Sequence, residues 1–106
     1  MDEKEAIVTL NDLKAGKMQV LENTRREIEN YGSMDQNGDL GDSAFHNDRK
    51  VELCATRMRY ETAINLIERN LADLEAGRDV ICTTCAKPIK NLERVALGYR
   101  THANCR

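Results

Sequence analysis

The chain has 106 residues and a formal net charge of −2, with 32% charged and 4% aromatic residues. A chain this short and this polar, with one Phe and no Trp, is poorly suited to a large globular core. The charge balance also gives no overall basic signature for nucleic-acid binding. One small domain, or a domain with an appendage, fits the length, and an elongated helical hairpin or a metal site fits the composition.

Neither a signal peptide nor a membrane span is predicted. The N-terminal stretch MDEKEAIVTL has no apolar core of signal-peptide length. No later run approaches the roughly 20 apolar residues that a membrane helix needs. We therefore expect a cytoplasmic protein that does not bind membranes. In a reducing cytosol, cysteines at paired spacing favour a metal site over disulfide bonds.

The first predicted element is a helix over residues 2–31. This segment has no Pro and only Gly16. Its apolar residues fall at helical spacings, at Ile7, Leu10, Leu13, Leu21, Ile28 and Tyr31. The apolar stripe is narrow, and Lys14, Lys17 and Thr24 interrupt it. Such a stripe is typical of a seam between two helices rather than of a broad globular face.

Three glycines break the helical pattern over residues 32–42. Here DQNGDLGDSAFH, residues 35–46, contains three acidic residues. A calcium loop starting at Asp35 needs Gly at its sixth position and Glu at its twelfth, where the chain has Leu40 and His46. Calcium binding is therefore weakly supported. A plain turn is a stronger interpretation, because Asp42 can cap the next helix and Asp39 can favour the same positive helix end.

A second helical pattern follows from about residue 43 to residue 77. Its heptad positions are Leu53, Tyr60, Ile67 and Leu74, with Ile64 and Leu71 at alternate seam positions. Nearer the loop, we expect the seam to be filled by Val51, Cys54, Ala55 and Met58, with Cys54 a buried small hydrophobe. Gly77 predicts the helix end.

Together, the two patterns predict a mainly α fold. Residues 1–77 should form an antiparallel coiled-coil helical hairpin with arms of roughly 40–50 Å and an acidic tip loop at about 33–43. Both chain ends should lie at its base. A turn alone does not explain why Asp39 and Asp42 cluster at the outermost point beside Leu40, which has nothing local to pack on. We interpret this tip as a structure that inserts into another protein.

Residues 78–106 predict a small zinc-binding module at the hairpin base. The spacing is C-x2-C-x16-H-x2-C, with Cys82, Cys85, His102 and Cys105 as ligands. Each pair brackets two residues, so that one tight turn offers two ligands to one ion. Structural zinc takes four such ligands in a tetrahedron, which leaves no open position for catalysis. We predict one structural zinc ion, whose binding helps to fold a segment with almost no core of its own.

The stretch NGDLGDSAFHNDRK resembles the tip of the Gre transcript-cleavage factors, which carry a GDLSENAEYH-like sequence. The matching positions are Gly38, Asp39, Leu40, the acidic Asp42, Ala44, the aromatic Phe45 and His46. Asp39, Asp42 and Ala44 also fit the D-x-x-D-x-A tip of the DksA/TraR family. A hairpin followed by a cysteine zinc module is the DksA/TraR layout, whereas Gre factors carry a larger β domain that this chain is too short to hold.

The sequence departs from the DksA/TraR pattern at two positions and from the Gre pattern at two others. DksA/TraR zinc modules typically have CxxCG and a second C-x2-C pair, whereas here Ala86 follows Cys85 and His102 replaces the third Cys. At the tip, Asp42 stands where Gre factors have Glu, and Phe45 stands where they have Tyr. The tip changes weigh against cleavage activity more than against binding.

The resemblance implies a transcription regulator that is not an enzyme by itself. Both families insert their hairpin into the secondary channel of bacterial RNA polymerase, where the tip approaches the catalytic Mg²⁺. DksA-like action would modulate initiation, whereas in Gre-like action Asp39 and Asp42 would help to hold a metal and orient a water for RNA cleavage. The rival hypothesis is a zinc-stapled helical adaptor without an active-site role. We expect a monomer without sequence-specific DNA binding.

Overall fold

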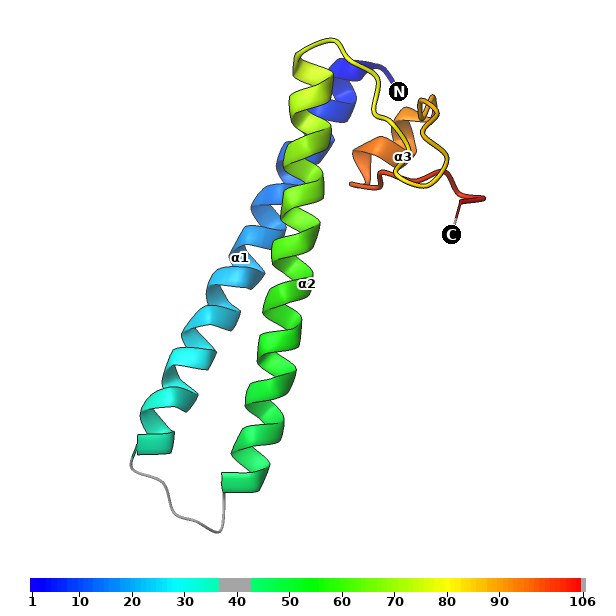
Figure 1. The fold of residues 1–106 in the computed structure, drawn as a ribbon. Helices are drawn as coiled ribbons and strands as arrows, with labels where there is room; N and C mark the ends of the chain where they lie inside the picture. Colours follow the sequence, from blue (N-terminus) through cyan, green and yellow to red (C-terminus); the bar gives the residue numbers. More distant parts are fainter. Residues whose placement is uncertain (37–42, 106) are drawn as a thin grey trace.

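The structure, a computed structural model, describes residues 1–36 and 43–105, with the side chains of residues 1–30 and 48–105. Two long helices, α1 (Glu3–Gln36) and α2 (Ser43–Glu75), are followed by the short α3 (Leu92–Ala96). The long helices pack against each other as an antiparallel hairpin, and the molecule extends over 55 × 26 × 18 Å (Figure 1). The predicted mainly α hairpin, with a cysteine–histidine cluster in its C-terminal segment, is confirmed.

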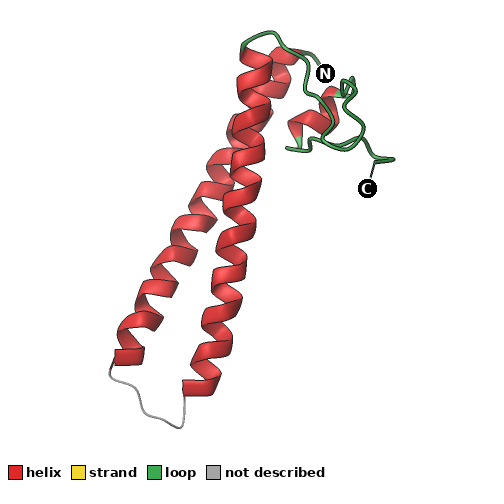
Figure 2. Ribbon diagram, in the orientation of Figure 1, coloured by secondary structure: helices red, strands yellow, loops and turns green. Residues whose placement is uncertain are grey.

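The remaining residues of the C-terminal segment form loops and turns (Figure 2). Within residues 43–105, β pairing is limited to an isolated antiparallel bridge between Ile81 and Pro88. Both chain termini lie at the end of the hairpin that carries this segment, which we call the base (Figure 1). In the part of the chain that the structure describes, no helix combines the length and the apolar character that crossing a membrane requires.

The start of α1 follows from local hydrogen bonding. Asp2 caps α1, because its carboxylate accepts the amide of Glu5 at 2.8 Å. α1 then continues to Gln36, so that it includes positions that the sequence assigned to the tip loop. Asp42, the predicted cap of α2, lies outside the described residues.

The predicted stop at Gly77 is confirmed. Gly77 has a left-handed φ of 72°, and the amide of Arg78 donates to the carbonyl of Asp73 at 2.8 Å. The amide of Gly77 donates to the carbonyl of Leu74 at 3.1 Å. These two bonds form a Schellman motif, which satisfies carbonyl groups at the helix end and turns the chain towards the C-terminal segment.

One apolar cluster joins the base of the hairpin to the C-terminal segment. Its buried members are Ala6, Leu10, Ile67, Leu71, Leu74, Val80, Cys82, Ile89, Val95 and Ala96. The segment therefore shares the core of the hairpin. The expectation that the segment has almost no core of its own is compatible with this shared packing, because α1 and α2 supply half of the cluster.

Two positions that interrupt the predicted stripe of α1 still face α2. Thr24 is buried, and its hydroxyl donates to the carbonyl of Val20 at 2.9 Å, which satisfies the polar group within the helix. The ammonium group of Lys17 lies 5.3 Å from the ring centroid of Tyr60. The stripe thus continues across these polar residues.

The loop-proximal part of α2 corrects another prediction. Val51 and Met58, which were expected in the seam, are 69% and 62% exposed, and Ala55 is also exposed. Leu53, a predicted heptad position, is buried as expected. Because two residues span about 200° around a helix, Val51 points away when Leu53 faces α1. Cys54 is half-buried rather than fully buried.

Candidate metal centre

The first pair of predicted ligands lies in a tight turn that begins in the core. Cys82 is buried, and its amide donates to the carbonyl of Lys87 at 2.9 Å. On the other side of the turn, the amide of Ala86 donates to the carbonyl of Cys82 at 3.0 Å. These bonds return the chain sharply after Cys85, so that two sulfur atoms face the same side.

Ala86 adopts a φ of 60° in this turn, in the left-handed region that glycine favours. The Cβ atom of an L-residue is disfavoured there by roughly 1–2 kcal/mol. Ala86 therefore adopts this conformation at a cost in backbone energy that a glycine would avoid.

The second pair of ligands follows α3. The side chain of Asn91 caps α3 by accepting the amides of Glu93 and Arg94 at 3.1 and 3.3 Å. The guanidinium of Arg94 then reaches forward and donates to the carbonyl of Thr101. Cys105 returns towards His102, because its amide donates to the His102 carbonyl at 3.0 Å.

The four predicted ligands converge. One ligand atom from each of Cys82, Cys85, His102 and Cys105 lies within 4.8 Å of all the others. His102 Nδ1 is 3.3 Å from Cys85 Sγ and 3.9 Å from Cys105 Sγ. With Zn–S bonds of about 2.3 Å and Zn–N bonds of about 2.0 Å, tetrahedral ligand atoms lie roughly 3.5–3.8 Å apart. The two distances to Nδ1 bracket the tetrahedral value, and the four atoms are close enough together to hold one ion after small shifts.

The orientation of His102 suits metal binding. Its Nε2 atom lies 3.0 Å from the carbonyl oxygen of Pro88, which can only accept a hydrogen bond. Nε2 is therefore assigned as the protonated nitrogen, and the lone pair of Nδ1 faces the sulfur atoms. A carbonyl that fixes the tautomer of a ligating histidine is a common feature around protein metal ions.

The thiols of the cluster influence each other electrostatically. Burial raises the pKa of Cys82, but hydrogen bonds from the backbone of Cys85, His102 and Thr84 outweigh it and lower the pKa to about 5. Burial raises the pKa of Cys105 to about 11, and the neighbouring thiols Cys85 and Cys82 contribute to the rise. The negative charge of one thiolate thus disfavours deprotonation of a second thiol. A divalent cation between them would replace that repulsion with attraction.

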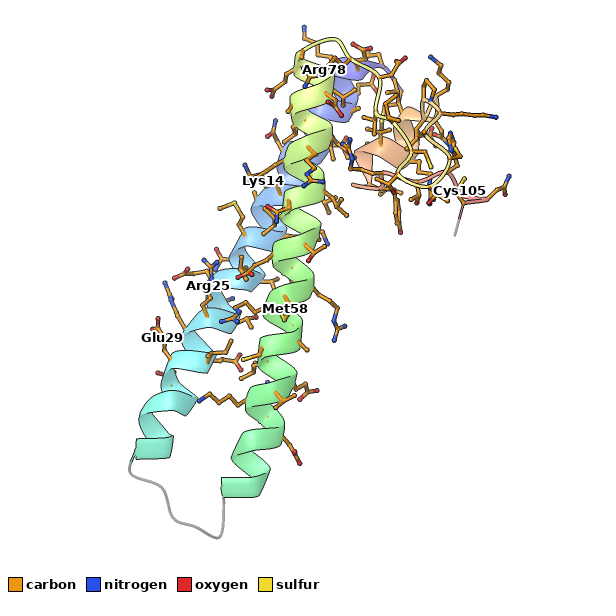
Figure 3. All side chains as sticks on the ribbon, in the orientation of Figure 1. Lys14, Arg25, Glu29, Met58, Arg78 and Cys105 are labelled. Atoms are coloured by element: carbon orange, nitrogen blue, oxygen red, sulfur yellow. The ribbon has the colours of Figure 1, made fainter. Side chains whose placement is uncertain are left out.

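These features define a candidate site for one metal ion at the base of the hairpin. All four cysteines are free thiols, and Cys105 lies on the side of the segment remote from the long helices (Figure 3). Three soft sulfur ligands and one imidazole are a donor set that suits zinc. Four protein ligands would close the tetrahedron, so the arrangement supports a structural crosslink between the two turns.

The predicted tip is not tested by the structure. Asp39, Leu40 and Asp42 lie outside the described residues, and Ala44, Phe45 and His46 lie in α2 with side chains outside the described set. The sequence analysis also overlooked three groups around the metal site, namely the Pro88 carbonyl, Asn70 and Arg100. A backbone carbonyl has no residue-specific signal, and no local motif relates Asn70 to residues 25 or more positions away.

No protein-family model, curated protein or solved structure matches this chain. The resemblance to DksA/TraR and Gre proteins therefore rests on the sequence positions given above.

Proposed function

We propose that this protein is a transcription regulator that inserts its hairpin into the secondary channel of bacterial RNA polymerase and modulates initiation near the catalytic Mg²⁺. One observation carries the proposal. The end of α1 at Gln36 and the start of α2 at Ser43 lie at the end of the hairpin opposite to the base (Figure 1). The acidic sequence NGDLGD connects the helices at that end.

The dimensions of the hairpin support this mode of action. Helices of 34 and 33 residues are each about 50 Å long and about 10–12 Å across with their side chains. A slender pair of packed helices can carry acidic residues into a narrow channel, while the wider base stays outside. Mg²⁺ prefers oxygen ligands and retains several waters, so carboxylates brought close to it can change its coordination.

We further propose that the metal centre holds one structural zinc ion. Its four ligands leave no open position, and it lies at the base rather than at the loop end. The ion would crosslink the segment that packs on the hairpin. This assignment supports an accessory factor that acts on the polymerase active site rather than an enzyme with a catalytic site of its own.

The test compares two double variants in transcription assays with purified bacterial RNA polymerase. Asp39→Ala/Asp42→Ala removes the tip acids, and Asp12→Ala/Glu29→Ala removes the same charge from exposed positions on α1. We expect the wild type and the α1 variant to alter initiation equally and the tip variant to lose the effect. Equal activity of all three proteins would contradict the tip mechanism.

Cleavage is distinguished with polymerase stalled on a backtracked template that carries labelled RNA. If the wild type shortens the RNA and Asp39→Ala/Asp42→Ala does not, the result would support Gre-like cleavage stimulation instead of initiation control. Without shortening, we expect the wild type to compete with a cleavage factor for the polymerase. Such competition supports a shared channel, and its absence would argue against channel binding.

A second candidate function is the zinc-stapled adaptor, and a specific observation favours it. Val51, Ala55 and Met58 form an exposed apolar face on α2 that nothing in the described chain covers (Figure 3 labels Met58). An adaptor would bind a partner through this flank. Met58→Asp should then abolish function while Asp39→Ala/Asp42→Ala has no effect. The opposite pattern supports the polymerase regulator.

A further inference from the structure

The interface between α2 and the metal-binding segment contains one completely buried polar side chain. Asn70 is 0% exposed, although most of its neighbours are apolar. Its Nδ2 atom donates to the carbonyls of Val95 and Tyr99, each at 3.1 Å. Its Oδ1 atom accepts from Arg100 Nη1 at 2.9 Å. The hydrogen bonds of its side chain thus go to the segment that carries the second ligand pair.

Arg100 connects this side chain to both halves of the metal centre. Its guanidinium also contacts Asp73 Oδ2 at 3.2 Å, and both side chains are largely buried. Its carbonyl accepts the amide of Thr83 at 2.9 Å, between the first two ligands. Along the chain, Arg100 precedes His102 by two residues. A displacement of Arg100 would therefore move the two ligand pairs relative to each other.

The packing around this connection permits little adjustment. Gly98 has a φ of 89°, and a Cβ atom built on it would lie 3.1 Å from Ile67 Cγ1. A side chain at this position would be strained by the left-handed backbone and would require the Ile67 side chain to shift.

Replacing Asn70 by an apolar residue would remove the Asn70 donor from the Tyr99 carbonyl and the acceptor from the Arg100 guanidinium. The Val95 carbonyl would still accept the amide of Gly98 at 2.9 Å. Losing partners at a largely buried site costs more than losing an exposed hydrogen bond.

We propose that Asn70, acting through Arg100, is a positioning residue that couples metal binding to closure of the hairpin base. The inference rests on the metal-binding part of the proposed function. The side chain of Asn70 hydrogen-bonds to Val95, Tyr99 and Arg100 rather than to a ligand, yet it fixes the orientation in which the two turns present their ligands. Coupling between two equilibria is reciprocal. Metal binding should therefore close the base as strongly as the Asn70 contacts strengthen metal binding.

The test measures metal affinity by Co²⁺ titration, followed by displacement with Zn²⁺ in the presence of a chelator. Asn70→Leu keeps the number and branching of the side-chain heavy atoms and removes the donor and acceptor atoms. We expect it to bind metal at least about 10-fold more weakly, in the range known for residues that orient metal ligands. The visible Co²⁺ bands should also shift, because the ligand geometry relaxes. Unchanged affinity and bands would overturn the proposal.

Leu21→Ala is the matched control. Leu21 is buried in the hairpin but is not part of the cluster at the base, so this variant loses stability without disturbing Arg100. It should bind Co²⁺ as the wild type does. If both variants weaken binding equally, Asn70 has only a general structural role and the proposal fails. If Asn70→Leu does not fold, Arg100→Met gives the same test on the other side of the bond.

Hydrogen exchange of the wild-type protein tests the reciprocal effect without a mutation. Metal removal should raise the exchange rates of the amides at residues 70–75 more than those at residues 57–62. Uniform or absent changes would overturn the coupling. A wild-type protein that takes up neither Co²⁺ nor Zn²⁺ would overturn the metal centre as well. Metal uptake that is insensitive to Asn70 would overturn the coupling alone.

Discussion

The two ends of the hairpin differ in what holds them together. At the base, residues from α1, α2 and the C-terminal segment share one buried cluster that includes a candidate metal ligand, Cys82. Nearer the loop end, the buried residues among the described side chains of the two helices are Leu21, Thr24, Leu53 and Ile64. The helices also diverge towards that end in Figure 1. The base is thus a folded core, whereas the loop-proximal half is a pair of helices in narrow contact.

Ion pairs replace apolar packing in the loop-proximal half. Arg25 pairs with Glu61 at 3.2 Å, and Arg49 pairs with Glu27 at 3.3 Å, all on well-exposed side chains. Figure 3 shows Arg25 on α1 in this region. Exposed pairs typically contribute about 0–1 kcal/mol each. The difference teaches that stability is concentrated at the base, so the loop-proximal half can adapt to a partner without unfolding the protein.

Metal removal should have the largest effect on the difference in stability between the base and the loop-proximal half. With free zinc 1,000-fold above its Kd, binding adds about 4.1 kcal/mol to the free energy of unfolding. Purified protein should contain one equivalent of zinc, and Cys82→Ser should lose it. Denaturant unfolding with and without a chelator measures the stability change. Identical curves, or metal-free protein with an unchanged circular dichroism spectrum, would show that the base is stable without metal.

Paired truncations compare the two ends directly. Leu10→Ala removes a side chain that is 0% exposed at the base, and it should cost about 2–5 kcal/mol because a cavity remains. Val51→Ala shortens an exposed side chain in the loop-proximal half, and it should change stability by no more than about 0.5 kcal/mol. Denaturant unfolding measures both. Comparable losses would mean that the loop-proximal half contains a core in solution.

A smaller effect is expected from the strained turn at the base. Ala86→Gly should remove the strain of the left-handed backbone at this position. Glycine also makes the unfolded chain more flexible, which offsets part of this gain, so we expect a net stabilisation of about 0.5–1 kcal/mol. Ala15→Gly, in the middle of α1, is the control and should destabilise it by about 1 kcal/mol. Thermal unfolding of both variants should therefore give shifts of opposite sign. If Ala86→Gly loses stability, the backbone at Ala86 is not strained.

Local patterns in the sequence determined the architecture and the metal ligands. Helical spacing of apolar residues predicted two long helices, Gly77 predicted the end of α2, and the ligand spacing predicted the cysteine–histidine cluster. These features depend on residues that are near each other along the chain. The same local signals ended the first helix at residue 31, whereas α1 continues to Gln36. The tip hypothesis for residues 39–46 stays a prediction.

Only the tertiary structure decided which residues the two helices bury and how the metal-binding segment docks. Leu53 faces α1 and Val51 does not, because the helix pair has room for one stripe of α2. Asn70 is buried because the carbonyls of Val95 and Tyr99 come to it from far along the chain. Such contacts have no local pattern, since they exist only once the chain has folded back on itself.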